Sequence, residues 1–134
     1  MPLKSKHKQQ QYKSNNEACE LTPWLQRNIP RLCDTRDYSL HLHHIVFAAC
    51  RYDFHTNFIV ISKTVHDWIH LRDTVSGSVL AVWKKVQKNE FDFDEFHKCA
   101  GRPLWNWLQS YEPKEPLIVP LWNELEAYSR ENRR

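Results

Sequence analysis

Two predicted strands lie close together in the middle of the chain, and they constrain its fold more than any other feature. Tyr38–Phe47 begins with apolar residues that alternate with polar ones, which is typical of a strand with one buried face. Phe58–Ile61 is a short apolar run rich in β-branched residues and predicts a second strand. The residues between them, Ala48–Asn57, are too many for a tight hairpin turn and predict a loop.

A helix is expected directly after the second strand. Thr64 is a good N-cap residue, and Asp67 follows it in the position of a capping box. The run Ser76-Gly77-Ser78 predicts that this helix ends soon after Asp73. Strand, loop, strand and helix together form a ββα unit over about 38–74.

The rest of the chain has a helical pattern. Apolar residues recur at helical spacing over about 78–130. The sequence Pro-Leu-Trp-Asn occurs at 103–106 and again at 120–123, where Pro suits the first turn of a helix and Leu-Trp suits the core. With 134 residues, of which 41% are hydrophobic, the chain is long enough for one domain and too short for two. We therefore expect an α+β fold, with the ββα unit embedded in a mostly helical single domain over 16–134.

The charge of the chain suits a polyanionic partner without requiring one. The net charge is +3, and residues 1–15 are rich in Lys and Gln, which predicts a flexible basic arm. Such an arm either contacts phosphate groups or only keeps the chain soluble. No apolar run is long enough for a membrane span or a signal peptide, so we expect a cytoplasmic protein.

The four cysteines are spread along the chain and form no Cys-x-x-Cys pair. This spacing argues against a zinc ribbon or knuckle and favours free, buried thiols in a reducing compartment. Cys33 and Cys50 lie on either side of the first histidine pair, so a second, structural metal site between them stays open as an alternative.

Histidine is concentrated in the predicted ββα unit. His66 and His70 are four residues apart on the predicted helix, so their side chains lie on the same face and can share one metal ion. His43 and His44 stand near the end of the first strand. Adjacent residues of a regular strand point to opposite faces, so a site that uses both predicts irregular backbone at this pair.

The order and spacing of these residues resemble the HNH nucleases of the ββα-metal superfamily, in particular colicin-type DNases and small phage endonucleases. The resemblance covers about a quarter of the chain and rests on His43-His44, Asn57, His66 and His70. It implies that His43, His66 and His70 bind one metal ion, that His44 is the general base, and that Asn57 steadies the base and its loop. The implied activity is DNA cleavage that leaves a 5′ phosphate and a 3′ hydroxyl. Unlike many members, the chain has no paired cysteines around this unit.

Phosphodiester hydrolysis fits these residue types. The reaction needs a base that works near neutral pH and a cation that stabilises the charge on the phosphoryl and leaving oxygens. Histidine, with an ordinary pKa of about 6.5, suits the first need. Three neutral imidazoles favour Zn²⁺, Ni²⁺, Mn²⁺ or Co²⁺ as the bound divalent ion, with Mg²⁺, which prefers oxygen ligands, as an alternative for activity.

Further residues are candidates for supporting roles. His41 shares a face with His43 in a regular strand, which suits a fourth or substitute ligand, a residue behind the ligands, or simple packing. His55 is expected in the loop, where it either contacts substrate or is solvated. Three cations close to the unit in sequence either neutralise flanking phosphates or are ordinary surface charge: Arg51, Lys63 and Arg72.

Two functions fit the sequence. The first is an endonuclease of a phage or mobile element that acts as a monomer or homodimer on double-stranded DNA, with RNA or branched DNA as alternative substrates. The second is a non-catalytic, zinc-stabilised module that binds nucleic acid or protein. His44 favours the enzyme because a structural site needs no base, and structural zinc usually has four ligands that include Cys.

Overall fold

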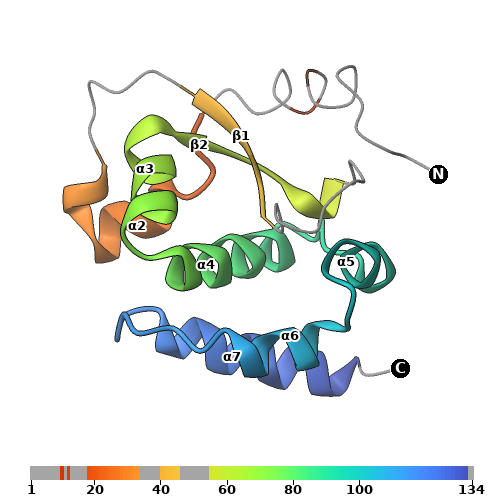
Figure 1. Ribbon diagram of the computed structural model, residues 1–134. Coiled ribbons are helices and arrows are strands. Elements are labelled where there is room, and N and C mark those ends of the chain that lie inside the picture. Colours follow the sequence, from red (N-terminus) through yellow and green to blue (C-terminus); the bar gives the residue numbers. More distant parts are fainter. Residues whose placement is uncertain (1–9, 11, 13–17, 34–39, 46–54, 133–134) are drawn as a thin grey trace.

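The computed structural model describes residues 10, 12, 18–33, 40–45 and 55–132. Within these residues the chain forms six α-helices, two 3₁₀ helices and one two-stranded antiparallel sheet, so the fold is α+β and mostly helical. Figure 1 shows the sheet and α3 above α4, with α6 and α7 below. No helix among the described residues is long and apolar enough to cross a lipid bilayer. Most of the expected arm over 1–15 lies outside the described residues.

The sheet consists of β1 (Leu40–His44) and β2 (Phe58–Ser62). Their antiparallel register pairs Leu40 with Ser62 and His44 with Phe58, without a break between these ends. Both expected strands are therefore present. All five residues of β2 are buried, because α3 covers one face and a small cluster around Tyr12 covers the other. Burial on both faces explains why β2 is a continuous apolar run without alternation.

The helix after β2 is α3 (Lys63–Leu71), and its N-cap differs from the sequence prediction. Ser62, the last residue of β2, is the N-cap, and its Oγ accepts a hydrogen bond from Val65 N at 3.4 Å. The expected cap, Thr64, lies inside the first turn. Ser62 takes this position because its extended backbone, φ −70 and ψ 162, leads the strand directly into the helix. Asp67 pairs instead with Lys63, Nζ to Oδ2 at 2.8 Å.

The expected break at Ser76-Gly77-Ser78 is wrong, since these residues lie inside α4 (Thr74–Gln87). The chain turns earlier, where α3 ends, and Asp73 caps the new helix by accepting a hydrogen bond from Ser76 N at 3.0 Å. Gly77 serves close packing: a Cβ added there would lie 2.4 Å from Ile69 Cγ1 of α3. The residues whose types predicted a helix break are therefore found where α4 packs closely against α3.

The C-terminal half is helical, as the sequence predicts. The chain turns between α5 and α6 at Gly101, whose φ of 76° is accessible to glycine without strain. In the repeated Pro-Leu-Trp-Asn motif, Leu104 and Leu121 are buried, and the indole of Trp122 donates a hydrogen bond to Leu108 O at 3.0 Å. The remaining helices have these bounds: α2 (Thr22–Asn28), η1 (Pro30–Leu32), η2 (His55–Asn57), α5 (Phe93–Ala100), α6 (Leu104–Ser110) and α7 (Val119–Glu131).

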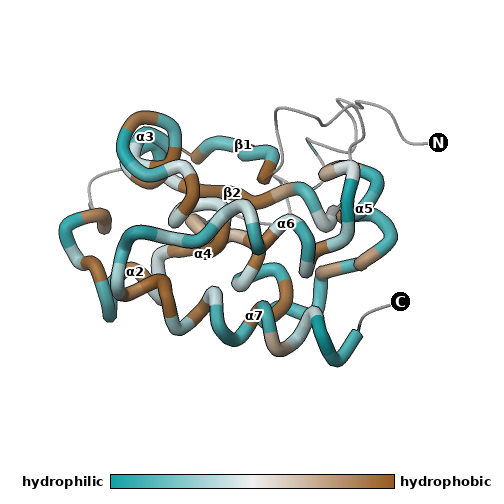
Figure 2. The backbone as a smooth tube through the Cα atoms, turned by 60° about the horizontal axis from the view of Figure 1, so that its bottom comes forward, coloured by the Kyte–Doolittle hydropathy of each residue, from teal (hydrophilic) through white to brown (hydrophobic). Residues whose placement is uncertain are grey.

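The main core lies between the sheet and the C-terminal helices, and Figure 2 shows β2 as a largely hydrophobic segment in the middle of the molecule. A buried polar network adjoins it. Tyr12 donates a hydrogen bond to Glu20 Oε2 at 2.8 Å, and the fully buried Lys85 donates to Tyr12 Oη at 2.9 Å. Glu20 also accepts from Val60 N at 2.6 Å, which covers the second edge of β2. Tyr12, within the segment expected as an arm, is thus anchored to the sheet.

Candidate metal centre

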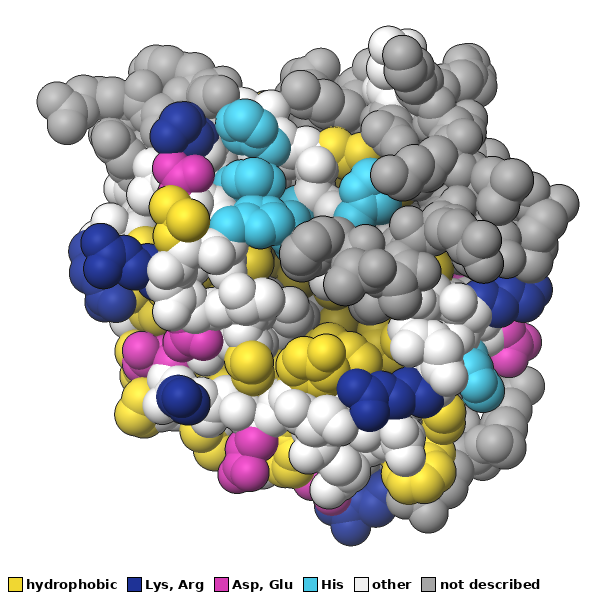
Figure 3. Space-filling view, in the orientation of Figure 1, with side chains coloured by type: hydrophobic (Ala, Val, Ile, Leu, Met, Phe, Trp, Pro, Cys, Tyr) yellow, Lys and Arg dark blue, Asp and Glu magenta, His cyan; other side chains and the backbone are white. Residues whose placement is uncertain are grey.

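Three histidines from two elements converge on one point. His43 comes from β1, and His66 and His70 come from α3, which packs against that strand. One ring nitrogen from each lies within 4.8 Å of the corresponding nitrogens of the other two, so the three can hold one metal ion. Histidine side chains gather in the upper part of the face shown in Figure 3.

The arrangement follows from the local structure. The i, i+4 spacing on α3 brings the rings of His66 and His70 to 4.3 Å between centroids. The register pairs His43 with Ile59, on the sheet face that α3 covers, and its ring lies 5.6 Å from that of His66 and 5.1 Å from that of His70. The prediction that the helix histidines share a face is confirmed.

His43 is the most constrained of the three. Its side chain is 3% exposed, and its Nε2 is buried and has no hydrogen-bond partner in the described part of the chain. Burial, helped by the neighbouring His70 and His66, lowers the pKa of His43 to about 3. The ring is therefore neutral at physiological pH and can offer a lone pair. A buried polar atom without a partner costs about 1–3 kcal/mol, which a bound cation would offset.

The other two ligand candidates face outward. Burial lowers the pKa of His66, and the nearby His70 and His41 lower it further. His66 is partly exposed and His70 is exposed. Three imidazoles with one side toward solvent leave room for further ligands, as catalytic metal sites do. The donor set suits Zn²⁺ and other divalent ions that accept imidazole.

His44 lies on the other face of the sheet. The ladder is regular through His43 and His44, and Ile45 N continues it by donating to Asn57 O at 2.9 Å. The prediction of irregular backbone at this histidine pair is therefore wrong, because pairing with β2 persists to the end of the strand. The ring of His44 packs against that of Phe58, with centroids 5.3 Å apart. It is still close enough for its charge to lower the pKa of His43.

Asn57 supports the end of β1. It is 2% exposed, and its carbonyl accepts the hydrogen bond from Ile45, the residue after His44. The preceding residue, Thr56, is a support that sequence reasoning missed. Its buried Oγ accepts from Asp92 N at 2.9 Å and lies 2.9 Å from Glu95 Oε1. Only the fold brings α5 to this turn, so no local pattern could have identified Thr56.

The other predicted residues lie around the centre or outside the described part. His41 shares the face of His43, as predicted, and its ring stacks on that of His66, with centroids 5.1 Å apart and an interplanar angle of 22°. It does not belong to the group of three nitrogens that can share an ion. Lys63 is exposed and paired with Asp67. Arg72 is exposed at the C-cap of α3. Two predictions fall outside what the structure describes: Arg51 and the side chain of His55.

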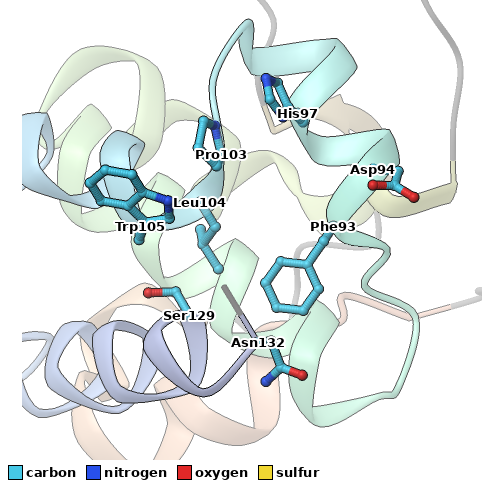
Figure 4. Close-up of a pocket in the computed structure, with 8 residues that line it drawn as sticks. All are labelled: Phe93, Asp94, His97, Pro103, Leu104, Trp105, Ser129 and Asn132. Carbon is cyan, nitrogen blue, oxygen red and sulfur yellow. The ribbon is translucent and has the colours of Figure 1, made fainter. Parts of the chain in front are cut away.

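Among the described residues, one group of His, Cys, Asp or Glu side chains could hold a metal ion, the three histidines. Cys19 and Cys33 are free thiols, and Cys50 lies outside the described residues, so a metal site between Cys33 and Cys50 stays a prediction. A small pocket at α5, the start of α6 and the end of α7 is lined by residues that include Asp94 and His97 (Figure 4). Of the His, Cys, Asp and Glu side chains that commonly bind metals, the described lining contains only these two, fewer than the three at the centre. Comparisons with family models, curated proteins and solved structures gave no match for the chain.

Proposed function

We propose that the protein is a metal-dependent endonuclease that hydrolyses phosphodiester bonds of DNA with one divalent ion held by His43, His66 and His70. The observation that carries this proposal is the buried Nε2 of His43, which lacks a hydrogen-bond partner among the described residues and lies in a group of three imidazoles. A cation at that point gives the nitrogen a partner. The resemblance to HNH nucleases supplies the reaction.

Each residue has a distinct part in this proposal. The bound ion would stabilise negative charge on the phosphoryl oxygens and on the leaving oxygen. His44 is the proposed base: it is the last residue of β1, and the residue is partly exposed to solvent. Asn57 holds the end of the strand through its carbonyl. One such unit offers one centre, so a monomer would nick one strand and a homodimer would cut both.

A second candidate function is a zinc-stabilised module that binds nucleic acid or protein without cutting. The position of His44 favours it, because this ring packs on Phe58 across the sheet from the three ligand candidates. In a purely structural site, the ion would contribute to folding and no base would be needed.

Plasmid cleavage distinguishes the two functions. The purified chain is incubated with supercoiled DNA and, in separate reactions, Mn²⁺, Ni²⁺, Co²⁺, Zn²⁺ or Mg²⁺. The proposed enzyme converts the plasmid to nicked or linear forms, and both His44→Ala and His43→Ala lose at least about 100-fold in rate, as expected for a base or a metal ligand. His97→Ala, which changes an exposed histidine on α5, is the matched control and should cut normally.

The outcomes separate cleanly. Cleavage that survives His44→Ala removes this residue as the base. A wild-type chain that never cuts DNA, RNA or branched substrates, but unfolds when the metal is chelated, supports the structural module. Calorimetric titration with Zn²⁺ tests the ligands independently of activity: His70→Ala should bind the ion at least about tenfold more weakly, in line with the loss of a ligand contact of 1.4 kcal/mol or more.

A further inference from the structure

A groove lies beside the metal centre, between η1 and α3. These two elements contact each other although the sequence separates them, and Figure 1 shows them side by side at the left of the molecule. Arg31 and Leu32 of η1 form one wall. The other wall comes from α3 and its C-cap: Thr64, Asp67, Trp68, Leu71 and Arg72.

The charge of this groove is positive. Arg31 and Arg72 are exposed, and neither forms an ion pair with another described residue. Asp67 is the one acid among the described residues of the lining, and its charge is offset by Lys63, whose Nζ lies 2.8 Å from Oδ2. Two guanidinium groups thus line a concave surface, and no carboxylate of a described residue pairs with either. Their planar donors match the oxygens of a phosphodiester.

The remaining lining suits the sugars of a nucleic-acid strand. Leu32 and Trp68 are the buried apolar residues of the two walls, 8% and 7% exposed, whereas Leu71 is 76% exposed. An exposed leucine is costly to hydrate and gains from contact with a sugar or base. Figure 3 shows Lys and Arg side chains to the left of the histidines on the same face.

The groove and the metal centre share one helix. Asp67 directly follows His66, and Leu71 directly follows His70, so these two wall residues are each next to a ligand candidate. With 3.6 residues per turn, successive residues of a helix are about 100° apart, so the groove and the metal centre lie on neighbouring faces of α3.

We propose that this groove binds the phosphate backbone of the DNA strand beside the phosphate at the metal centre, with Arg31 and Arg72 each contacting one phosphate. The inference rests on the proposed nuclease function for the place of the cut. Backbone contacts carry no sequence information, so the groove sets the position of the strand and leaves target choice to other residues.

Salt-dependent binding tests the groove. The full chain with Zn²⁺ is titrated against a short phosphorothioate duplex, which resists hydrolysis, and fluorescence anisotropy gives the affinity over a NaCl series. Each lost phosphate contact should reduce the slope of log affinity against log salt by about 0.9, so the Arg31→Ala, Arg72→Ala double variant should lose about 1.8. Arg27→Ala, an exposed arginine on α2, is the matched control and should leave the slope unchanged.

Two further readouts make the result decisive. Calorimetric Zn²⁺ affinity should be the same in the double variant as in the wild type, because neither arginine belongs to the metal-binding group. The groove proposal is overturned if the double variant keeps the wild-type slope. It is also overturned if a polyglutamate peptide displaces DNA at equal charge concentration. If the slope falls but the wild type never cuts, the groove stands and the nuclease function fails; if the wild type cuts and the slope is unchanged, only the groove fails.

Discussion

Gly77→Ala tests how closely α3 and α4 pack beside the metal centre. The new Cβ would lie 2.4 Å from Ile69 Cγ1 and 3.1 Å from Ile69 Cβ, whereas carbon atoms in contact are usually about 3.5–4.0 Å apart. Ile69 is 1% exposed, so its side chain has little room to move. Relieving such a clash costs about 1–3 kcal/mol. Alanine is the better helix former by up to about 1 kcal/mol, so the free energy of unfolding should fall by a net amount of about 0–2 kcal/mol.

A double-mutant cycle with Ile69→Ala isolates this contact. Urea unfolding followed by tryptophan fluorescence gives the free energy of unfolding for each variant. Without the γ carbons of Ile69, Gly77→Ala should stabilise the chain by up to about 1 kcal/mol, so the coupling energy should equal the cost of the clash, about 1–3 kcal/mol. Gly101→Ala is the control: its Cβ meets nothing within 4 Å, so its cost comes from the positive φ of 76° and should be the same in both backgrounds. An equal effect of Gly77→Ala in both backgrounds would refute the close approach of the helices.

Three further predictions concern buried polar groups. Burial lowers the pKa of His43 to about 3, below its unfolded value of about 6.5, so protonation of this ring favours the unfolded chain. The free energy of unfolding should therefore be highest above pH 6.5 and should fall as the pH is lowered toward 3. Urea unfolding of the metal-free chain should show a loss of about 2 kcal/mol between pH 7 and 5, and His43→Leu should remove this pH dependence. Thr56→Val should cost about 2 kcal/mol, because it keeps the shape but removes the hydroxyl that bonds to the segment before α5 and to α5 itself. Thr56→Ser should retain most of the stability, and equal stability of the Val and Ser variants would contradict this role. Tyr12→Phe should cost about 1–2 kcal/mol in thermal unfolding, because Glu20 and Lys85 each lose a partner; an unchanged midpoint would show that Tyr12 does not anchor its segment.

The sequence predicted elements where the local pattern and the fold agree. The β-branched run at Phe58 is a strand in the structure, and the apolar residues at helical spacing after about 78 lie in helices. The i, i+4 spacing of His66 and His70 placed both rings on one face of α3. In each of these cases the geometry depends on residues within a few positions of one another, so a short stretch of sequence contains the necessary information.

Boundaries were less predictable because they depend on contacts between elements. Ser62 caps α3 where β2 ends, although Thr64 also belongs to the residue types that favour an N-cap. Gly77 has the low helix propensity expected of a break, but the packing of α4 on Ile69 needs a residue without a side chain there. Tertiary contacts of a few kcal/mol outweigh local preferences of about 1 kcal/mol or less.

For the candidate site, the sequence by itself determined which imidazoles are available and that two of them share a helix face. Only the tertiary structure decided which member of the His43-His44 pair joins them, because the register of β1 on β2 sends His43 toward α3 and His44 to the opposite face. The same is true of the groove, which Arg31 and Arg72 line together only because η1 packs against α3. Local spacing sets the direction of a side chain relative to its own element, while strand register and helix packing, which depend on distant residues, set what it faces.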